Sequence, residues 1–168
     1  MVKESDAIRN LETTERDYCP NSAENLPIQR ITSKEIDIPS ILKSIDDGAV
    51  GAKVLFVGTV RNFSDNGDVV GMTYESYIGM AEDKIKNIEI DAKKIWGIKK
   101  ISIIHRIGEL TIGDNSVAIA ISTSHSKDAF AACQFILDKI KNEVPIWKKE
   151  KIMNGETKWV EGKSIKND

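Results

Sequence analysis

The order of apolar patterns along the chain is the feature that most constrains its fold. In three segments, apolar residues recur every three or four positions, the period of one helix face; elsewhere they run continuously or alternate, which is typical of strands. From residue 28 the order is strand, helix, hairpin, helix, hairpin, helix, hairpin. A parallel sheet needs regular alternation of strands and helices, so this order predicts an α+β fold with largely antiparallel sheets and three main helices.

The helices are predicted from their apolar faces and end signals. The first begins at Pro39 and is expected to stop at Gly48. The second ends at Gly97, and its inward face is Ala81, Ile85, Ile88, Ala92 and Ile95. The third follows His125 and ends before Pro145. Its inward face is expected to be Phe130, Cys133, Ile136, Leu137 and Ile140.

Strands are expected at 28–32, 52–60, 72–77, 100–107 and 116–123, with a last hairpin around Asn154 and Gly155. The apolar run 52–60 is predicted to be buried on both faces and to pair with 72–77 across the Asn66-Gly67 turn. Segments 100–107 and 116–123 are predicted to pair antiparallel, with the second one central.

Length and composition indicate a single domain. The chain has 168 residues, of which 40% are hydrophobic, and this is enough to form a hydrophobic core. We expect a flexible N-terminal extension at 1–27, one domain at 28–162 and a frayed C-terminus at 163–168. No apolar run is long enough to span a membrane and no signal peptide is recognisable, which favours a cytoplasmic protein without membrane contact.

Charge and cysteine usage exclude several classes of function. The 24 basic and 26 acidic residues nearly cancel, which disfavours a nucleic-acid binder. Cys19 and Cys133 are too few and too far apart for a disulfide framework or a metal pair, and Cys133 is expected to be structural. With two histidines and none of the common phosphate, dinucleotide, hydrolase or zinc motifs, we expect no metal and no cofactor.

Cationic side chains at the ends of elements are the candidates that remain. They are Arg61 after a strand, His125 before a helix, and Lys141, Lys148 and Lys149 around Pro145. Each has a plain alternative. The lysines suit a solvated face, Arg61 could pair with Asp65, and His125 could only cap its helix. His105, inside a strand, is expected to be a buried or sheet-face residue without a catalytic role.

Four short motifs, in order, resemble the large subunit of molybdopterin synthase: FVGTVRN (56–62), HRIGEL (105–110), STSHS (122–126) and VPIWKKE (144–150). The resemblance implies an α/β hammerhead-type fold and a homodimer within a heterotetramer that includes a small ubiquitin-like sulfur-carrier subunit. It also implies sulfur transfer from the carrier's thiocarboxylated C-terminus to cyclic pyranopterin monophosphate, which forms the dithiolene of molybdopterin. A non-catalytic phosphate-binding or scaffold subunit of the same fold is the alternative.

The resemblance also implies site residues. Lys141 and Lys148 match the family's catalytic lysines, and Lys141 is expected to matter most. The substrate-binding residues implied are Thr59, Val60, Arg61, His125, Ser126, Lys141, Lys148, Lys149 and Glu150. His125 is expected to serve the partner subunit's site. Ser126 stands where several relatives have arginine, and Lys127 is the nearest cation.

Overall fold

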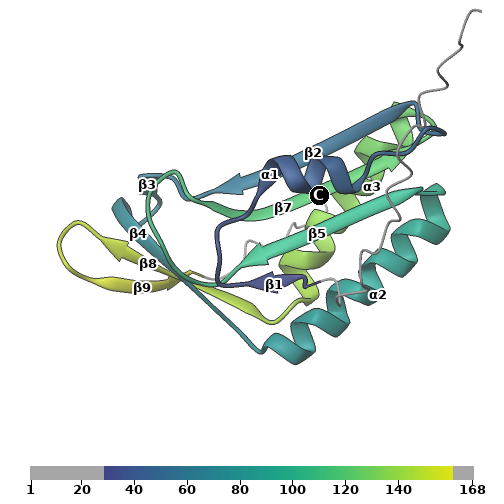
Figure 1. Cartoon of the computed structure of the whole chain (residues 1–168). Helices are drawn as coiled ribbons and strands as arrows, with labels where there is room; N and C mark the ends of the chain where they lie inside the picture. The colour runs from purple at the N-terminus through teal and green to yellow at the C-terminus, as the bar shows by residue number, and fades with distance from the viewer. Residues whose placement is uncertain (1–28, 161–168) are drawn as a thin grey trace, which may run out of the picture.

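The structure is a computed structural model and describes residues 29–160. The expected extension at 1–27, Cys19 and the C-terminus at 163–168 lie outside this range. The elements form two sheets, as Figure 1 shows. No helix within 29–160 is both long enough and apolar enough to cross a membrane.

The first sheet has 4 strands in the order β1-β5-β7-β2. They are β1 (Ile31–Thr32), β5 (Lys100–Arg106), β7 (Asn115–Thr123) and β2 (Ala52–Thr59). β1 and β5 are parallel, and the other two pairs are antiparallel. The predicted antiparallel pairing of β5 with β7 and the central place of β7 are therefore confirmed.

The second sheet has 5 strands. They are β3 (Phe63–Ser64), β4 (Gly67–Ser76), β8 (Ile146–Ile152), β9 (Thr157–Val160) and β6 (Gly108–Leu110). All its pairs are antiparallel, and β6 pairs with β4 on the edge opposite β8. The hairpin predicted at Asn154-Gly155 is β8–β9, and Gly155 has the positive φ of 88° that the turn requires.

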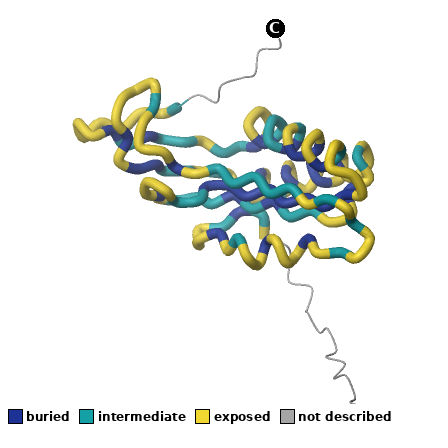
Figure 2. Tube along the Cα trace, turned by 90° about the horizontal axis from the view of Figure 1, so that it is seen from above, coloured by how far each residue is buried: buried dark blue, intermediate teal, exposed yellow. Residues whose placement is uncertain are grey.

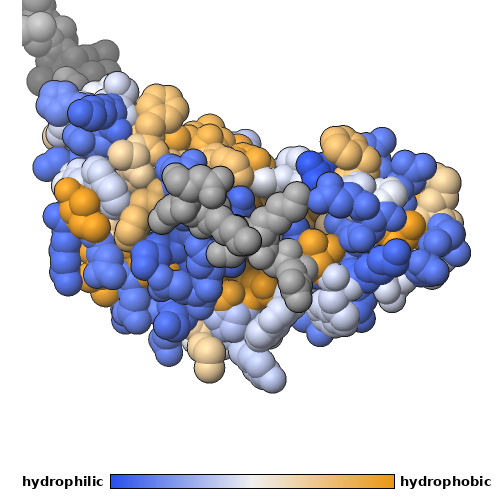
Figure 3. All heavy atoms as spheres, turned by 180° about the vertical axis from the view of Figure 1, so that it is seen from behind, coloured by the Kyte–Doolittle hydropathy of each residue, from blue (hydrophilic) through white to orange (hydrophobic). Residues whose placement is uncertain are grey.

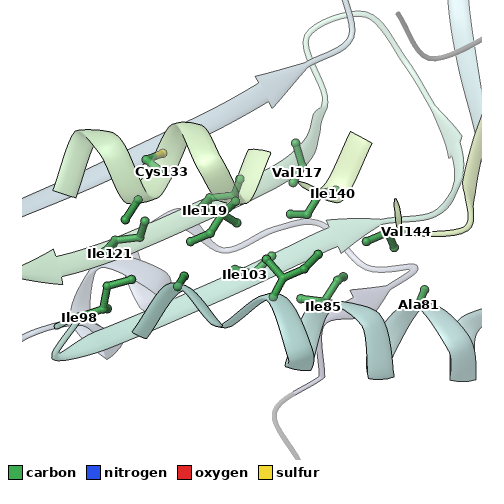
Figure 4. Packing of buried hydrophobic residues seen from close by; sticks show 14 of the residues in the cluster. Ala81, Ile85, Ile98, Ile103, Val117, Ile119, Ile121, Cys133, Ile140 and Val144 are labelled. Carbon is green, nitrogen blue, oxygen red and sulfur yellow. The ribbon is translucent and has the colours of Figure 1, made fainter. Parts of the chain in front are cut away.

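Helices cover both faces of the first sheet. α2 (Ile78–Trp96) and α3 (Ser126–Glu143) pack on one face, and α1 (Ile38–Ser44) lies on the other. The side chains of β7 alternate between these layers. Val117, Ile119 and Ile121 face α2 and α3, whereas Ala118 and Ala120 face α1. Figure 4 shows the larger core, and Figure 2 shows that buried residues concentrate in the central strands.

The amphipathic patterns placed α2 and α3 correctly but misassigned two side chains. Gly97 ends α2 in the left-handed conformation (φ 58°), as predicted. Ile95, however, is 59% exposed, because Trp96 and Ile98 cover that end of the core instead. Phe130 is 66% exposed, because α3 packs on the sheet through small residues, Ala129 and Ala132.

Two strand predictions and one helix end need correction. Segment 52–60 does not pair with 72–77: β2 pairs with β7, and the Asn66-Gly67 turn instead joins the two-residue β3 to β4. β2 is the edge strand of its sheet, so its side chains are half-buried instead of buried on both faces. α1 begins with Pro39 in its first turn, as predicted, but ends at Ser44, before Gly48.

Candidate functional site

A groove of about 1260 Å³ lies where the two sheets and the end of α3 meet. It is lined by the end of β2, the β3–β4 turn, the start of β7, the last turn of α3 and parts of β4, β8 and β9. The candidate site residues it brings together are Thr59, Val60, Arg61, Lys141, Lys148 and Glu150. Residues from three distant parts of the sequence therefore converge on one groove.

A β-bulge at the end of β2 directs Arg61 to the groove. The register with β7 shifts between Gly58 and Thr59, which re-aims the chain at that point. Gly58 packs so closely on β7 that a Cβ there would lie 2.7 Å from Cγ1 of Val117. Val60 is buried, whereas Arg61 is exposed, and its guanidinium lies 4.7 Å from the centre of the Phe63 ring.

The turn at Pro145 brings two lysines into the groove from different elements. α3 ends at Glu143 because Val144 before the proline is extended. Lys141 lies exposed in the last helical turn, and Lys148 is half-buried in β8. Glu143 forms an ion pair with Lys139, one turn earlier on α3.

Buried polar residues complete the groove. Glu150 is 4% exposed, and its Oε2 accepts hydrogen bonds from Ser64 Oγ (2.8 Å) and Asn66 Nδ2 (2.9 Å). Tyr74 and His105 also line the groove, with ring centres 5.1 Å apart in an edge-to-face arrangement. Burial raises the pKa of Tyr74, against a smaller lowering effect of the Ser116 hydroxyl.

His105 is a buried strand residue, as the sequence predicted. Desolvation lowers the pKa of its imidazole to about 4, outweighing a bond between Nδ1 and the Arg106 carbonyl, which raises it. Sequence reasoning did not place His105, Tyr74, Ser64 or Asn66 at the groove. The alternation along β4, which turns Met72 and Tyr74 to the same face, was the signal that could have found Tyr74.

Three residues assigned by resemblance lie away from this groove. His125 and Ser126 are exposed at the start of α3. At about 1.5 Å per helical residue, His125 lies about 24 Å from Lys141 along the helix. Lys149 is on β8, with its Nζ 4.4 Å from the centre of the Trp159 ring and 4.0 Å from Oε1 of Glu75.

The groove suits anions and proton transfer more than metal or thiol chemistry. Arg61, Lys141 and Lys148 are cations on its lining. Within residues 29–160, no group of three or more histidine, cysteine, aspartate or glutamate residues is placed to hold a metal. Cys133 is buried in the core, and burial raises the pKa of its thiol, which disfavours the nucleophilic thiolate. Hydrophilic residues cover most of the face seen in Figure 3.

Comparison with known proteins identifies the family. The MoaE protein family model matches residues 31–143. The chain is 40% identical over 129 residues to the molybdopterin synthase catalytic subunit of Thermoplasma volcanium, covering 77% of this chain and 94% of that one. It is 41% identical over 114 residues to the Pseudomonas aeruginosa catalytic subunit, covering 68% of this chain and 75% of that one.

Solved structures agree. Molybdopterin synthase from Staphylococcus aureus superposes with a TM-score of 0.75 at 36% identity, covering 80% of this chain and 98% of that one. A complex of subunits 1 and 2 of molybdopterin-converting factor from Helicobacter pylori shares the fold, with a TM-score of 0.63 at 24% identity, covering 81% and 90%. The chain belongs to the MoaE family, the catalytic subunits of molybdopterin synthase.

Proposed function

We propose that this catalytic subunit transfers sulfur from the thiocarboxylated C-terminus of a small ubiquitin-like carrier to cyclic pyranopterin monophosphate. Two transfers would build the dithiolene of molybdopterin. The observation that carries the proposal is the convergence of Arg61, Lys141 and Lys148 on one groove from β2, α3 and β8. Both proposed substrates are anions, and cations from rigid elements can hold them together in a fixed orientation.

The cationic groove matches what this chemistry requires. The thiocarboxylate brings its own sulfur, so the subunit supplies anion binding and proton transfer and needs no cysteine nucleophile. In each transfer, the thiocarboxylate sulfur forms a C–S bond to the pterin substrate and displaces an oxygen substituent there. Water then cleaves the C–S bond to the carrier's terminal carbonyl carbon, and the carrier is released as a carboxylate. We assign anion binding to Arg61, and proton transfer and charge stabilisation to Lys141 and Lys148. Thr59, Val60 and Glu150 are proposed to complete the binding segment.

The proposed assembly is a homodimer of this subunit with one small carrier subunit at each end. His125 and Ser126 lie about 22 to 24 Å from Lys141 along α3, which is compatible with a role at the partner subunit's groove. Lys127 would supply the cation there. We also propose that Lys149 belongs to the binding segment, although its amine lies over the Trp159 ring. The cytoplasmic location also stays a prediction.

The test supplies the purified protein with thiocarboxylated carrier and cyclic pyranopterin monophosphate and measures the dithiolene product. Lys141→Ala is expected to abolish product, whereas Lys139→Ala, on the same helix and paired with Glu143, is expected to retain it. In β8, Lys148→Ala is expected to lower turnover strongly. Lys151→Ala is the matched control, because that amine pairs with Glu109, 2.8 Å away.

Two outcomes would contradict the proposal. Equal loss of product in Lys141→Ala and Lys139→Ala would show that turnover depends on the overall charge of α3 and not on a lysine in the groove. If the wild type binds the carrier and still forms no product, the non-catalytic scaffold alternative is favoured.

A further inference from the structure

Glu150 is a buried carboxylate that accepts hydrogen bonds from the turn between β3 and β4. It lies in β8 opposite Met72 of β4 and is 4% exposed. Its Oε2 accepts both the Ser64 hydroxyl at 2.8 Å and the Asn66 amide at 2.9 Å. Hydrogen bonds to a carboxylate acceptor are about twice as strong as neutral ones, so these two bonds link β8 firmly to the turn.

The strand that leads into the turn is short. Among the described residues, β3 has 2 residues and pairs with β4, through Phe63 with Asp68 and Ser64 with Gly67. Within the turn, the Asn66 backbone N–H donates to Ser64 Oγ at 3.1 Å, so Ser64 links Asn66 to Glu150 a second time. Two-stranded pairs of this length are not stable alone. Glu150 is therefore an anchor that helps to place the turn.

Arg61 is connected to the same turn. Its guanidinium lies 4.7 Å from the centre of the Phe63 ring, next to Ser64. The backbone N–H of Val69 also donates to the carbonyl of Asn62, which ties this segment to β4. Any displacement of the Ser64–Asn66 turn would move Phe63 and, with it, the surface on which Arg61 rests.

We infer that Glu150 is a positioning residue that acts through Ser64 and Asn66 to hold Arg61 over the groove. This role rests on the proposed function. It makes Glu150 part of the binding segment through its effect on Arg61, and not through direct contact with substrate, which is the role that the family resemblance implies. An unengaged carboxylate on the groove lining would repel the anionic substrates, whereas a carboxylate bonded to the turn organises a cation toward them.

The activity test changes the turn and leaves the carboxylate in place. Ser64→Ala/Asn66→Ala is expected to raise KM for cyclic pyranopterin monophosphate about tenfold, the effect of losing about one net hydrogen bond, with kcat changed less. Glu150→Ala should do the same, and combining all three changes should be no worse than Glu150→Ala. In an Arg61→Ala background, the turn variant should add nothing. Glu109→Ala removes an exposed carboxylate outside the groove and serves as the control.

A wild-type KM in Ser64→Ala/Asn66→Ala beside a raised KM in Glu150→Ala would overturn the inference, as would full additivity with Arg61→Ala. A second measurement is independent of turnover. Amide hydrogen exchange of residues 62–68 should accelerate in Glu150→Ala and stay unchanged in Glu109→Ala. Unchanged exchange in Glu150→Ala overturns the inference even if the enzyme is active. Accelerated exchange in a protein that forms no product supports the link to the turn and puts the failure on the proposed reaction.

Discussion

Acid is expected to destabilise the protein through His105, whose imidazole is buried beside Tyr74. The pKa of this group is about 4 in the folded protein, against an ordinary value of 6.5. Between these values the unfolded chain binds more protons than the folded one, so the free energy of unfolding falls as the pH falls from 6.5 to 4. The contribution is fully present above pH 6.5. A difference of about 2.5 pH units corresponds to roughly 3 kcal/mol.

The assay is urea unfolding of the wild type and His105→Phe between pH 7.5 and pH 4. Phenylalanine keeps an aromatic ring beside Tyr74 and removes the titrating group. The absolute stability of the variant can change, because the bond to the Arg106 carbonyl is lost. The test therefore compares how the free energy of unfolding depends on pH in the two proteins. The wild type should lose roughly 3 kcal/mol more than the variant over this range. Parallel curves would refute the reasoning, and the same flattening in His125→Asn would point to a general histidine effect.

Two further pairs of variants test the packing around the site and the anchor of β1. Gly58→Ala is expected to cost about 1 to 3 kcal/mol in thermal unfolding and to lower turnover, because its Cβ would meet Val117 beside the bulge. Gly79→Ala, with nothing within 4 Å, should raise stability by up to about 1 kcal/mol, and equal losses at both glycines would contradict the packing argument. Arg30→Met breaks a bidentate pair with the buried carboxylate of Glu89 and should cost about 3 kcal/mol, whereas Arg30→Met/Glu89→Met should recover much of it in urea unfolding. No recovery would refute the explanation that an unpaired buried carboxylate causes the loss.

The features that the sequence predicted correctly are those encoded locally. These features are the faces of α2 and α3 apart from Ile95 and Phe130, the left-handed end at Gly97 and the stop before Pro145. Each depends on a few neighbouring residues. The pairing of β2 could not be predicted in this way. β2 and β4 are neighbours in the chain and share a turn signal, but β2 joins β7, some sixty residues later. Non-local pairing depends on which apolar faces fit together, and that information is spread over the whole chain.

The groove residues likewise include some that the sequence predicted and some that it did not. Arg61, Lys141 and Lys148 were predicted because each stands at the end of an element, and the structure places all three on the groove lining. Tyr74 and His105 lie within strands. Alternation can assign such a residue to one face of its strand, but nothing local shows that this face lines a site. Their part in the groove follows from the way the second sheet folds against the first.

The charged run 148–151 shows why a run of charges in a strand is not one surface. Successive side chains of a strand point to opposite faces. Lys148 and Glu150 line the groove opposite Tyr74 and Met72. Lys149 and Lys151 lie on the other face, near Glu75 and Glu109. One segment therefore contributes both to a solvated face and to a cationic site. The register of β8 against β4 decides which residues lie on each face. A one-residue slip of that register would exchange the two sets and remove Lys148 from the groove.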